Sequence, residues 1–176
     1  MKLVGLVGEP ATGKTTLMRA VLKRLGGYTD FKYRLVYGRQ YPSGLFVLGI
    51  YRDGEMFGGT DRLSMAVQPD AIRFLKKVPA HSVVLFEGDR LTRAGFLRAA
   101  GDDLFLFVLE ASDHEKERRH RERADTQAVT FHRSRATLVQ RIAADFPSLR
   151  LRNESLMDLA KNVEHVLAAV GVGCLY

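Results

Sequence analysis

The sequence predicts a three-layer α/β fold built on a mostly parallel five-stranded sheet. Short apolar runs at 3–7, 83–86 and 104–109 are rich in Val, Leu and Phe and are bounded by Gly or charged residues, as buried parallel strands are. Helical patterns lie between these runs, and strands that alternate with helices indicate a sheet covered on both faces. With 46% hydrophobic content, residues 1–176 fit a single domain that buries its own core.

The first helix is predicted at 15–25, directly after the first strand. Its apolar face recurs at helical spacing in Leu17, Met18, Val21, Leu22 and Leu25. Gly26-Gly27 then supplies a stop signal. Two strands, 34–41 and 45–52, form a hairpin around the turn-prone Pro42-Ser43-Gly44. The remaining predicted elements are helices near 70–77, 91–100, 112–124 and 135–145, a short strand at 149–152, and a closing helix at 155–170 with Ser155 as its N-cap.

Residues 8–15 match the complete phosphate-binding pattern G-x-x-x-x-G-K-[ST], between the first strand and the first helix. The predicted nucleotide-binding residues are Gly8, Glu9, Pro10, Ala11, Thr12, Gly13, Lys14, Thr15 and Thr16. The glycines let backbone N–H groups point at phosphate oxygens, and the helix N-terminus adds a partial positive charge. We expect Lys14 to bridge the β- and γ-phosphates of ATP and Thr15 to bind Mg²⁺, while Thr16 reaches a phosphate oxygen or only caps the helix. The alternative is a glycine-rich turn that binds no ligand.

The strand at 83–86 ends in Glu87-Gly88-Asp89-Arg90, which narrows the class of P-loop protein. Switch GTPases usually carry an Asn-Lys-x-Asp element that this sequence lacks, and motor ATPases usually end this strand in Asp or Asp-Glu. At a strand's carboxyl end we expect Glu87 to join Thr15 as a Mg²⁺ ligand and Asp89 to orient an acceptor hydroxyl. Arg90 is expected to pair with an acceptor phosphate. In the alternative, Asp89 caps the next helix and Arg90 is solvated.

A second acid and base pair, Asp61-Arg62, lies in an insertion at about 34–68 that we expect to bind the acceptor. We favour Asp61 as the base that orients the acceptor, with Arg62 beside it. The alternative is that Asp61 caps a helix beginning at Arg62. Because phosphoryl transfer depends more on positioning than on a strong base, the choice among Asp61, Glu87 and Asp89 stays open.

A second insertion, at about 113–141, is expected to form an arginine-rich lid over ATP. Its arginines include Arg118, Arg119, Arg121, Arg123, Arg133 and Arg135. Arg119 and Arg123 share one helical face, as do Arg118 and Arg121, so the helix could offer one pair inward. We expect Arg119 and Arg123 to reach the transferring phosphoryl group while the lid excludes water. The alternative is a solvated helix face, and we expect about half of these arginines to be solvated.

Charge and cysteine content restrict the partners. The net charge of +7 favours polyanions or highly charged phosphates, and residues 115–141 carry eight Lys and Arg against four acids. The single cysteine, Cys174, allows no internal disulfide, so we expect a cytoplasmic protein. No stretch approaches the ~20 apolar residues of a membrane span, so we expect no membrane partner. The oligomeric state stays open.

The order of these parts resembles the nucleotide and nucleoside kinases of the P-loop class. The matching segments are 8–16, Glu87-Gly88-Asp89-Arg90, the arginine-rich helix from 115, and Asn153-Glu154-Ser155 before the last helix. Within that group, 57–65 and 86–91 look like small phage-encoded kinases, which phosphorylate deoxynucleoside monophosphates or 5-hydroxymethyluracil within DNA. The resemblance implies an ATP- and Mg²⁺-dependent phosphotransferase, in the host cytoplasm if phage-encoded. The chain departs from the thymidylate kinase pattern, since Glu-Gly-Asp-Arg replaces Asp-Arg-Tyr or Asp-Arg-His.

The acceptor ranked first is the hydroxymethyl group of 5-hydroxymethyluracil in DNA, because clustered arginines would neutralise backbone phosphates. The aromatic residues proposed to stack an extruded base are Tyr37, Tyr41, Phe46, Tyr51 and Phe57. At alternating strand positions, these rings also suit the core of the sheet. A free deoxynucleoside monophosphate is the second acceptor, and a nucleotide-gated regulatory ATPase without an acceptor is the third hypothesis.

Overall fold

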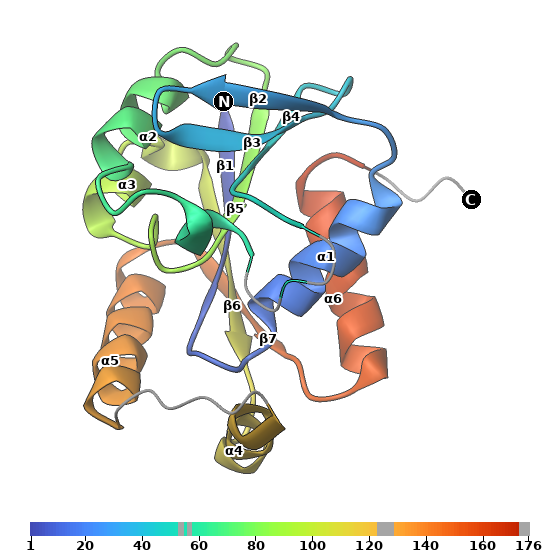
Figure 1. The fold of residues 1–176 in the computed structure, drawn as a ribbon, viewed down its shortest axis with the longest axis vertical. Coiled ribbons are helices and arrows are strands. Elements are labelled where there is room, and N and C mark those ends of the chain that lie inside the picture. Colours follow the sequence, from blue (N-terminus) through green and yellow to red (C-terminus); the bar gives the residue numbers. More distant parts are fainter. Residues whose placement is uncertain (53–54, 56–57, 123–128, 173–176) are drawn as a thin grey trace.

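The computed structural model describes the backbone of residues 1–52, 55, 58–122 and 129–172. A central sheet carries helices on both faces, which confirms the predicted three-layer α/β fold (Figure 1). The sheet has seven strands in the order β2-β3-β4-β5-β1-β6-β7. The α-helices are α1 (Lys14–Arg24), α2 (Gln68–Leu75), α3 (Ala94–Arg98), α4 (Asp113–Glu122), α5 (Val129–Asp145) and α6 (Leu156–Ala169). Short 3₁₀ turns lie at Thr60–Arg62 and Gly101–Asp103.

Five of the strands run parallel, as the sequence predicts. They are β4 (Leu45–Leu48), β5 (Val83–Glu87), β1 (Lys2–Gly8), β6 (Leu104–Glu110) and β7 (Ser148–Arg152). Strand β1 lies between β5 and β6, and Leu6 pairs with both Glu87 and Phe107. Because β1 is buried on both faces, its apolar run is continuous rather than alternating.

The predicted five-stranded sheet is too small, because two antiparallel strands extend it beyond β4. Strand β3 (Val36–Gln40) pairs with β4 as the predicted hairpin, and the unpredicted β2 (Thr29–Tyr33) pairs with β3. Strand β2 escapes sequence prediction because none of its side chains is fully buried. Its mixture of polar and aromatic residues suits an exposed edge strand, where no apolar run marks the position.

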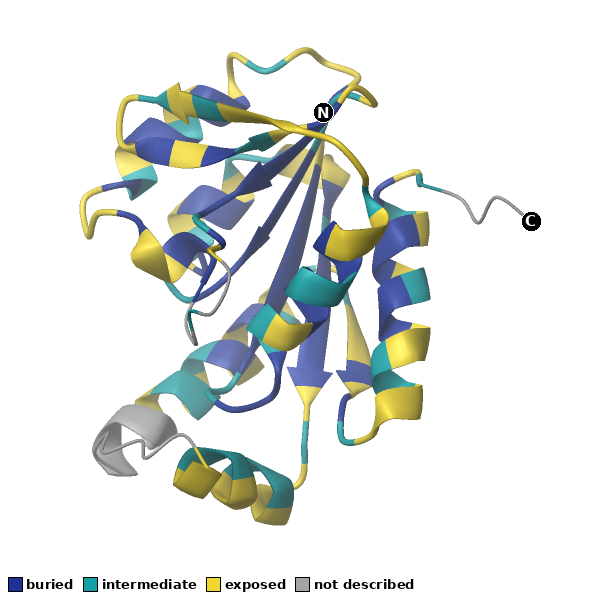
Figure 2. Cartoon of the chain, turned by 45° about the vertical axis from the view of Figure 1, so that its right-hand side comes forward, coloured by how far each residue is buried: buried dark blue, intermediate teal, exposed yellow. Residues whose placement is uncertain are grey.

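The helices divide between two cores. Helices α1 and α6 cover one face of the sheet, and α2, α3 and α5 cover the other. The buried side chains of α1 are Leu17, Met18, Val21 and Leu22, which confirms most of the predicted apolar face. Figure 2 shows the central strands as buried, whereas α4 is partly or fully exposed along its length. Helix α4 therefore lies outside both cores, below the carboxyl end of β6 in Figure 1.

Two predicted helix boundaries shift. Helix α3 begins at Ala94 rather than 91, because Thr92 donates its hydroxyl to the Gly88 carbonyl at 2.8 Å and Arg93 is extended. Helix α5 begins at Val129 rather than 135. The predicted cap of α6 is present, since the Ser155 hydroxyl accepts from Asp158 and the Asp158 carboxylate accepts from the Ser155 backbone.

Candidate functional site

The phosphate loop joins β1 to α1 at the centre of the sheet edge where the parallel strands end. Gly13 adopts a left-handed conformation with φ 91°, and a Cβ there would lie 2.4 Å from Asn153 Nδ2. A Cβ on Gly8 would lie 2.7 Å from the Leu109 carbonyl oxygen. Both positions therefore require glycine, because the neighbouring chain leaves no room for a side chain. The loop shape rests on contacts with β6 and the segment after β7.

Lys14 is the first residue of α1, and its ammonium group folds back over the loop. Its Nζ donates to the carbonyl oxygens of Gly8 at 2.7 Å and Glu9 at 2.9 Å. These neutral acceptors orient the ammonium without cancelling its charge. A bound phosphate would therefore find a cation already held beside the backbone N–H groups of the loop.

Thr15 and Glu87, the two predicted Mg²⁺ ligands, are in contact. Thr15 Oγ1 donates to Glu87 Oε1 at 3.1 Å, and Glu87 is only 1% exposed. The pKa of Glu87 is raised to about 8, mainly by desolvation; the Lys14 cation opposes this shift and Asp61 adds to it. A divalent cation would reverse this shift by favouring the carboxylate. A hydroxyl and a carboxylate are oxygen ligands that fit Mg²⁺.

Asp61 approaches the same region from the insertion. Its Oδ1 accepts from the backbone N–H groups of Asp89 at 2.8 Å and Arg90 at 3.0 Å. Thr60 beside it donates its hydroxyl to the Glu87 carbonyl at 2.8 Å. Desolvation raises the pKa of Asp61, and the nearby Asp89 raises it further. Asp61 caps the turn after β5 rather than a helix, since the 3₁₀ turn at Thr60–Arg62 has Gly59 as its N-cap.

Asp89 and Arg90 leave the end of β5 in different directions. Asp89 Oδ2 forms an ion pair with Arg135 Nε of α5 at 3.1 Å, so Asp89 does not cap α3, whose N-cap is Arg93. One guanidinium N–H group of Arg90 donates a hydrogen bond to the Asp61 carbonyl oxygen at 3.1 Å. Arg90 Nε is buried and has no hydrogen-bond partner among the described residues. The end of β5 thus brings together acids and cations, as predicted.

Arg62 and two of the aromatic residues, Tyr41 and Phe46, depart from the expected site. Arg62 pairs with Glu55 at 3.2 Å, within the insertion, rather than with Asp61. Phe46 packs edge-on against Phe31 and Phe74 in the core, and Tyr41 is 3% exposed, so these two rings fill the sheet rather than face a base. Tyr37 is partly exposed. Arg123 and Phe57 lie outside the described residues.

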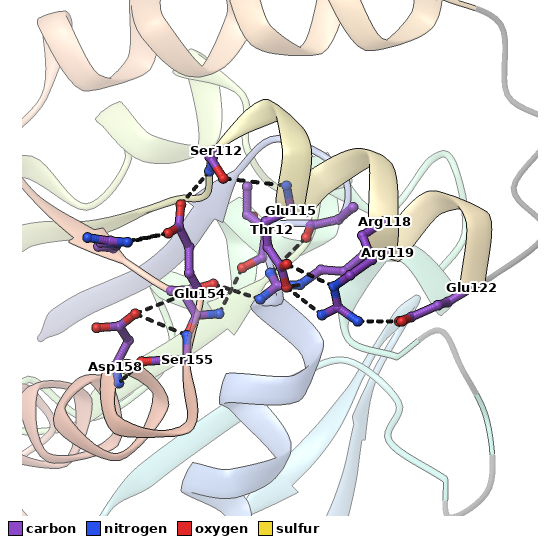
Figure 3. Close-up of polar contacts among 12 residues, drawn as sticks. Thr12, Ser112, Glu115, Arg118, Arg119, Glu122, Glu154, Ser155 and Asp158 are labelled. Carbon is purple, nitrogen blue, oxygen red and sulfur yellow. Dashed lines mark hydrogen bonds and ion pairs between the residues drawn. The ribbon is translucent and has the colours of Figure 1, made fainter.

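Helix α4 reaches the phosphate loop through one of its two adjacent arginines. Arg119 donates to the carbonyl oxygens of Ala11 at 3.0 Å and Asn153 at 2.8 Å, and Asn153 Nδ2 donates to the Thr12 carbonyl at 2.8 Å (Figure 3). Arg118 instead pairs with Glu115 and Glu122 on the exposed side of α4. Arg119 therefore faces the loop backbone, and its contact with the transferring phosphoryl group stays a prediction.

Two residues of this region were missed at the sequence level. Lys116 Nζ pairs with Glu9 Oε2 at 3.0 Å, which ties α4 to the phosphate loop a second time. Asn153 is buried and braces the loop at Thr12. Its position directly after β7, at the carboxyl end of a parallel strand, was the available signal.

Two cavities flank Glu154 beside the loop. One of about 350 Å³ is lined by Gly13, Thr16, Glu115, Arg118, Arg119, Glu122, Asn153, Glu154, Ser155, Leu156 and Leu159. It borders the start of α1 and has the size of a small-molecule site. The other, of about 380 Å³, has three acids, Glu9, Glu110 and Glu154, and one arginine, Arg152, whereas the first has two arginines beside its three acids and so carries less negative charge. The first cavity is therefore the better candidate for a nucleoside joined to phosphates on the loop.

Two other features are absent from the described residues. In the part of the chain that the structure describes, no group of three or more His, Cys, Asp or Glu could hold a metal ion. Across the same residues, no helix has the length and apolarity needed to cross a membrane.

Comparisons with known proteins show the family of the chain and a similar fold. Residues 1–166 match the family described as P-loop Nucleotide Kinase3. A gluconokinase from Sinorhizobium meliloti 1021 has a similar fold, with a TM-score of 0.53, 12% identity, and coverage of 97% of this chain and 91% of that chain. No curated protein matches the sequence.

Proposed function

Because the chain belongs to the P-loop Nucleotide Kinase3 family, we propose that it transfers the γ-phosphoryl group of ATP to a nucleotide-type acceptor. The observation that carries this proposal is the meeting of Lys14, Thr15 and Glu87 where β1 and β5 end. Lys14 is held over the loop, and Thr15 Oγ1 lies 3.1 Å from Glu87 Oε1. These groups supply a phosphate cradle, a cation and oxygen ligands in one place.

The residues of the donor side have separate tasks. The loop N–H groups and the Lys14 ammonium would bind the β- and γ-phosphates, and Lys14 would leave its carbonyl partners to do so. Mg²⁺, when held by Thr15 and Glu87, neutralises charge that develops on these phosphates. Arg119 supports the loop from α4, and the cavity beside Thr16 would take the nucleoside. The chain therefore positions the donor mainly through its backbone.

The transfer step exchanges one phosphorus–oxygen bond for another. The acceptor hydroxyl oxygen attacks the γ-phosphorus, the bond to the β–γ bridging oxygen breaks, and ADP leaves. The hydroxyl proton passes to a carboxylate, which we assign to Asp61. Its Oδ1 holds the turn after β5, which leaves Oδ2 for the acceptor. The raised pKa of Asp61 makes this carboxylate a better proton acceptor.

The proposed acceptor is the hydroxymethyl group of 5-hydroxymethyluracil in DNA. A net charge of +7 favours a polyanionic acceptor over a neutral one. Gly58 lies between Tyr51 and Thr15, since a Cβ there would contact Tyr51 Cδ1 at 3.1 Å and Thr15 Cγ2 at 3.2 Å. Tyr51 is buried, and its hydroxyl has no hydrogen-bond partner among the described residues. A base placed beside this ring would gain a hydrogen bond that the free protein lacks.

A free deoxynucleoside monophosphate is the alternative acceptor, and one observation favours it. Arg90 Nε is buried beside Asp61 without a hydrogen-bond partner in the described chain. An acceptor phosphate would satisfy this donor through a charge-assisted hydrogen bond. In that case the γ-phosphoryl group would pass to a phosphate oxygen, and no strong base would be required.

The test is transfer of labelled γ-phosphate from ATP, with Mg²⁺, to acceptors in parallel reactions. One reaction contains DNA with 5-hydroxymethyluracil, a second contains unmodified DNA, and a third contains the four deoxynucleoside monophosphates. Label only in the modified DNA supports the proposed acceptor. Label only in the free nucleotides establishes the alternative. Release of labelled phosphate without any labelled acceptor would contradict the kinase proposal and indicate a regulatory ATPase.

A further inference from the structure

A small basic hollow lies beside helix α1, outside the groups that surround the phosphate loop. Its volume is about 130 Å³, and its lining residues are Arg19, Leu22, Lys23, Arg39, Tyr51 and Arg52. Four of the six are cations, and no carboxylate lines the hollow among the described residues. A site of this composition attracts an anion, and its volume is far below the ~300 Å³ at which nucleoside-sized pockets begin.

The cations of the hollow are oriented mainly by groups that do not cancel their charge. The Arg39 guanidinium lies 4.1 Å from the Tyr28 ring centroid and donates to the Tyr51 carbonyl at 2.8 Å. Arg19 donates to the carbonyl oxygens of Arg52, at 3.2 Å, and Glu55. A ring face and backbone carbonyls fix these side chains in place but leave the positive charge for a ligand.

The remaining two cations of the hollow are Lys23 and Arg52. Lys23 is exposed and has no ion pair or side-chain hydrogen bond to another described residue. Arg52 lies 3.6 Å from the Glu55 carboxylate, which Arg62 approaches more closely at 3.2 Å. One carboxylate shared between two arginines leaves the hollow with a net positive charge.

The hollow is connected to the transfer site through α1 and Tyr51. Thr15, Arg19 and Lys23 follow one another at intervals of four residues, so they share one face of the helix. With a rise of about 1.5 Å per residue, Lys23 lies about 12 Å along the axis from Thr15. Tyr51 lines the hollow and also borders Gly58, next to Thr15. An extended ligand could therefore occupy both places.

We propose that the hollow binds a backbone phosphate of the DNA strand whose reacting base lies beside Thr15 and Glu87. The inference rests on the proposed function, because it assigns to the same acceptor a contact outside its reacting nucleotide. The two arginines present planar guanidinium groups suited to a phosphate, and Lys23 adds a flexible point charge. A free nucleotide that occupies the transfer site has no second phosphate to place in this hollow. The hollow would thus select a polymeric acceptor over a free one.

The experiment measures binding of an unmodified, fluorescently labelled single-stranded DNA by anisotropy over a range of NaCl concentrations. The variant is Lys23→Ala, since loss of this exposed side chain leaves the fold intact. The matched control is Lys76→Ala, an exposed lysine just after α2 on the opposite face of the sheet. We expect Lys23→Ala to weaken binding and to reduce the slope of log K against log[NaCl] by about 0.7, as for one lost phosphate contact. The control should retain the wild-type slope.

This design separates the hollow from the acceptor assignment, because binding is measured without transfer. An unchanged affinity and slope in Lys23→Ala would overturn the proposal even if modified DNA is phosphorylated. A reduced slope supports the hollow even if the transfer assay finds only free nucleotides as acceptors. A further arm replaces the DNA by a deoxynucleoside monophosphate. Equal dependence of this free nucleotide on Lys23 would overturn the assignment to a polymeric strand.

Discussion

The phosphate loop and helix α4 touch each other, yet they are built in opposite ways. The conformation of the loop is fixed by close packing around its backbone. Ala11 and Thr12 are 5% and 1% exposed, and Gly8 and Gly13 lie where no side chain fits. Helix α4 has no buried residue, and its contacts with the loop are made by charged side chains. The loop therefore belongs to the folded core, whereas α4 is attached to it by a few polar contacts.

This difference indicates how the two regions divide the work. The loop backbone has its binding conformation before a phosphate arrives. The free-energy cost of ordering it is therefore met when the protein folds, not during transfer. Helix α4 has no buried residue and contacts the loop through the charged side chains of Arg119 and Lys116, so we expect it to leave and return without unfolding the domain, as a lid requires. Replacement of single side chains should consequently abolish function in the loop but only retune it in α4.

The largest expected effect comes from the loop. Replacement Lys14→Ala removes the cation beside the transferring phosphoryl group. The rate of transfer should fall about 10²- to 10³-fold, as in other enzymes that lose one preorganised hydrogen-bond donor. The fold should persist, because the hydrogen bonds of the Lys14 ammonium go to carbonyls of the loop, and thermal melting should match that of the control Lys76→Ala. Steady-state rates with labelled ATP measure the effect. A wild-type rate in Lys14→Ala would remove the loop from the reaction.

The same contrast explains what the sequence could predict. The parallel strands β1, β5 and β6 could be predicted from the sequence because they are buried on both faces, so each is a continuous apolar run. The phosphate loop could be predicted because all the residues of its motif lie within one short segment of the sequence. Helix α1 and the Ser155 cap followed from the same kind of local signal.

The parts that could not be predicted depend on which distant segments meet. The sequence favours Asp61 as the base but leaves the choice among Asp61, Glu87 and Asp89 open, and only the fold places Glu87 against Thr15 and Asp89 against Arg135. Strand β2 has no buried face to reveal it. Helical spacing alone also could not decide which arginine of α4 turns inward, because that depends on the position of Asn153 across the loop.

Adjacent arginines in α4 give the next, smaller effect. Arg119→Ala removes hydrogen bonds to the carbonyls of Ala11 and Asn153, and charged hydrogen bonds of this kind contribute about 1.5–3 kcal/mol. Misplacement of the loop should lower kcat about 10-fold or more, up to about 10²-fold. The matched control is Arg118→Ala, whose guanidinium pairs with Glu115 and Glu122 rather than with the loop. Because Arg118 also lines the proposed nucleoside cavity, kcat is compared at saturating ATP. The control should keep nearly wild-type kcat and melting temperature.

Equal losses of kcat in Arg119→Ala and Arg118→Ala would contradict the distinction between the inner and outer faces of α4. A loss confined to Arg118→Ala would reverse it. Because both variants remove one guanidinium from the same helix, a change in net charge or helix propensity cannot account for a difference between them.

The smallest expected effect is a pH dependence within α4 itself. Glu115 pairs first with Arg118 and also with Arg119, and these contacts lower its pKa to about 2 from an ordinary value near 4.5. Because the folded pKa is the lower one, the contribution of this carboxylate to stability is present above pH 4.5 and is lost as the pH falls toward 2. Titration of the Glu115 carboxyl carbon by NMR should therefore show a midpoint well below that of an exposed glutamate. A midpoint near 4.5 would mean that α4 does not hold these pairs in solution, and its attachment to the loop would then rest on Lys116 and Arg119 without help from Glu115.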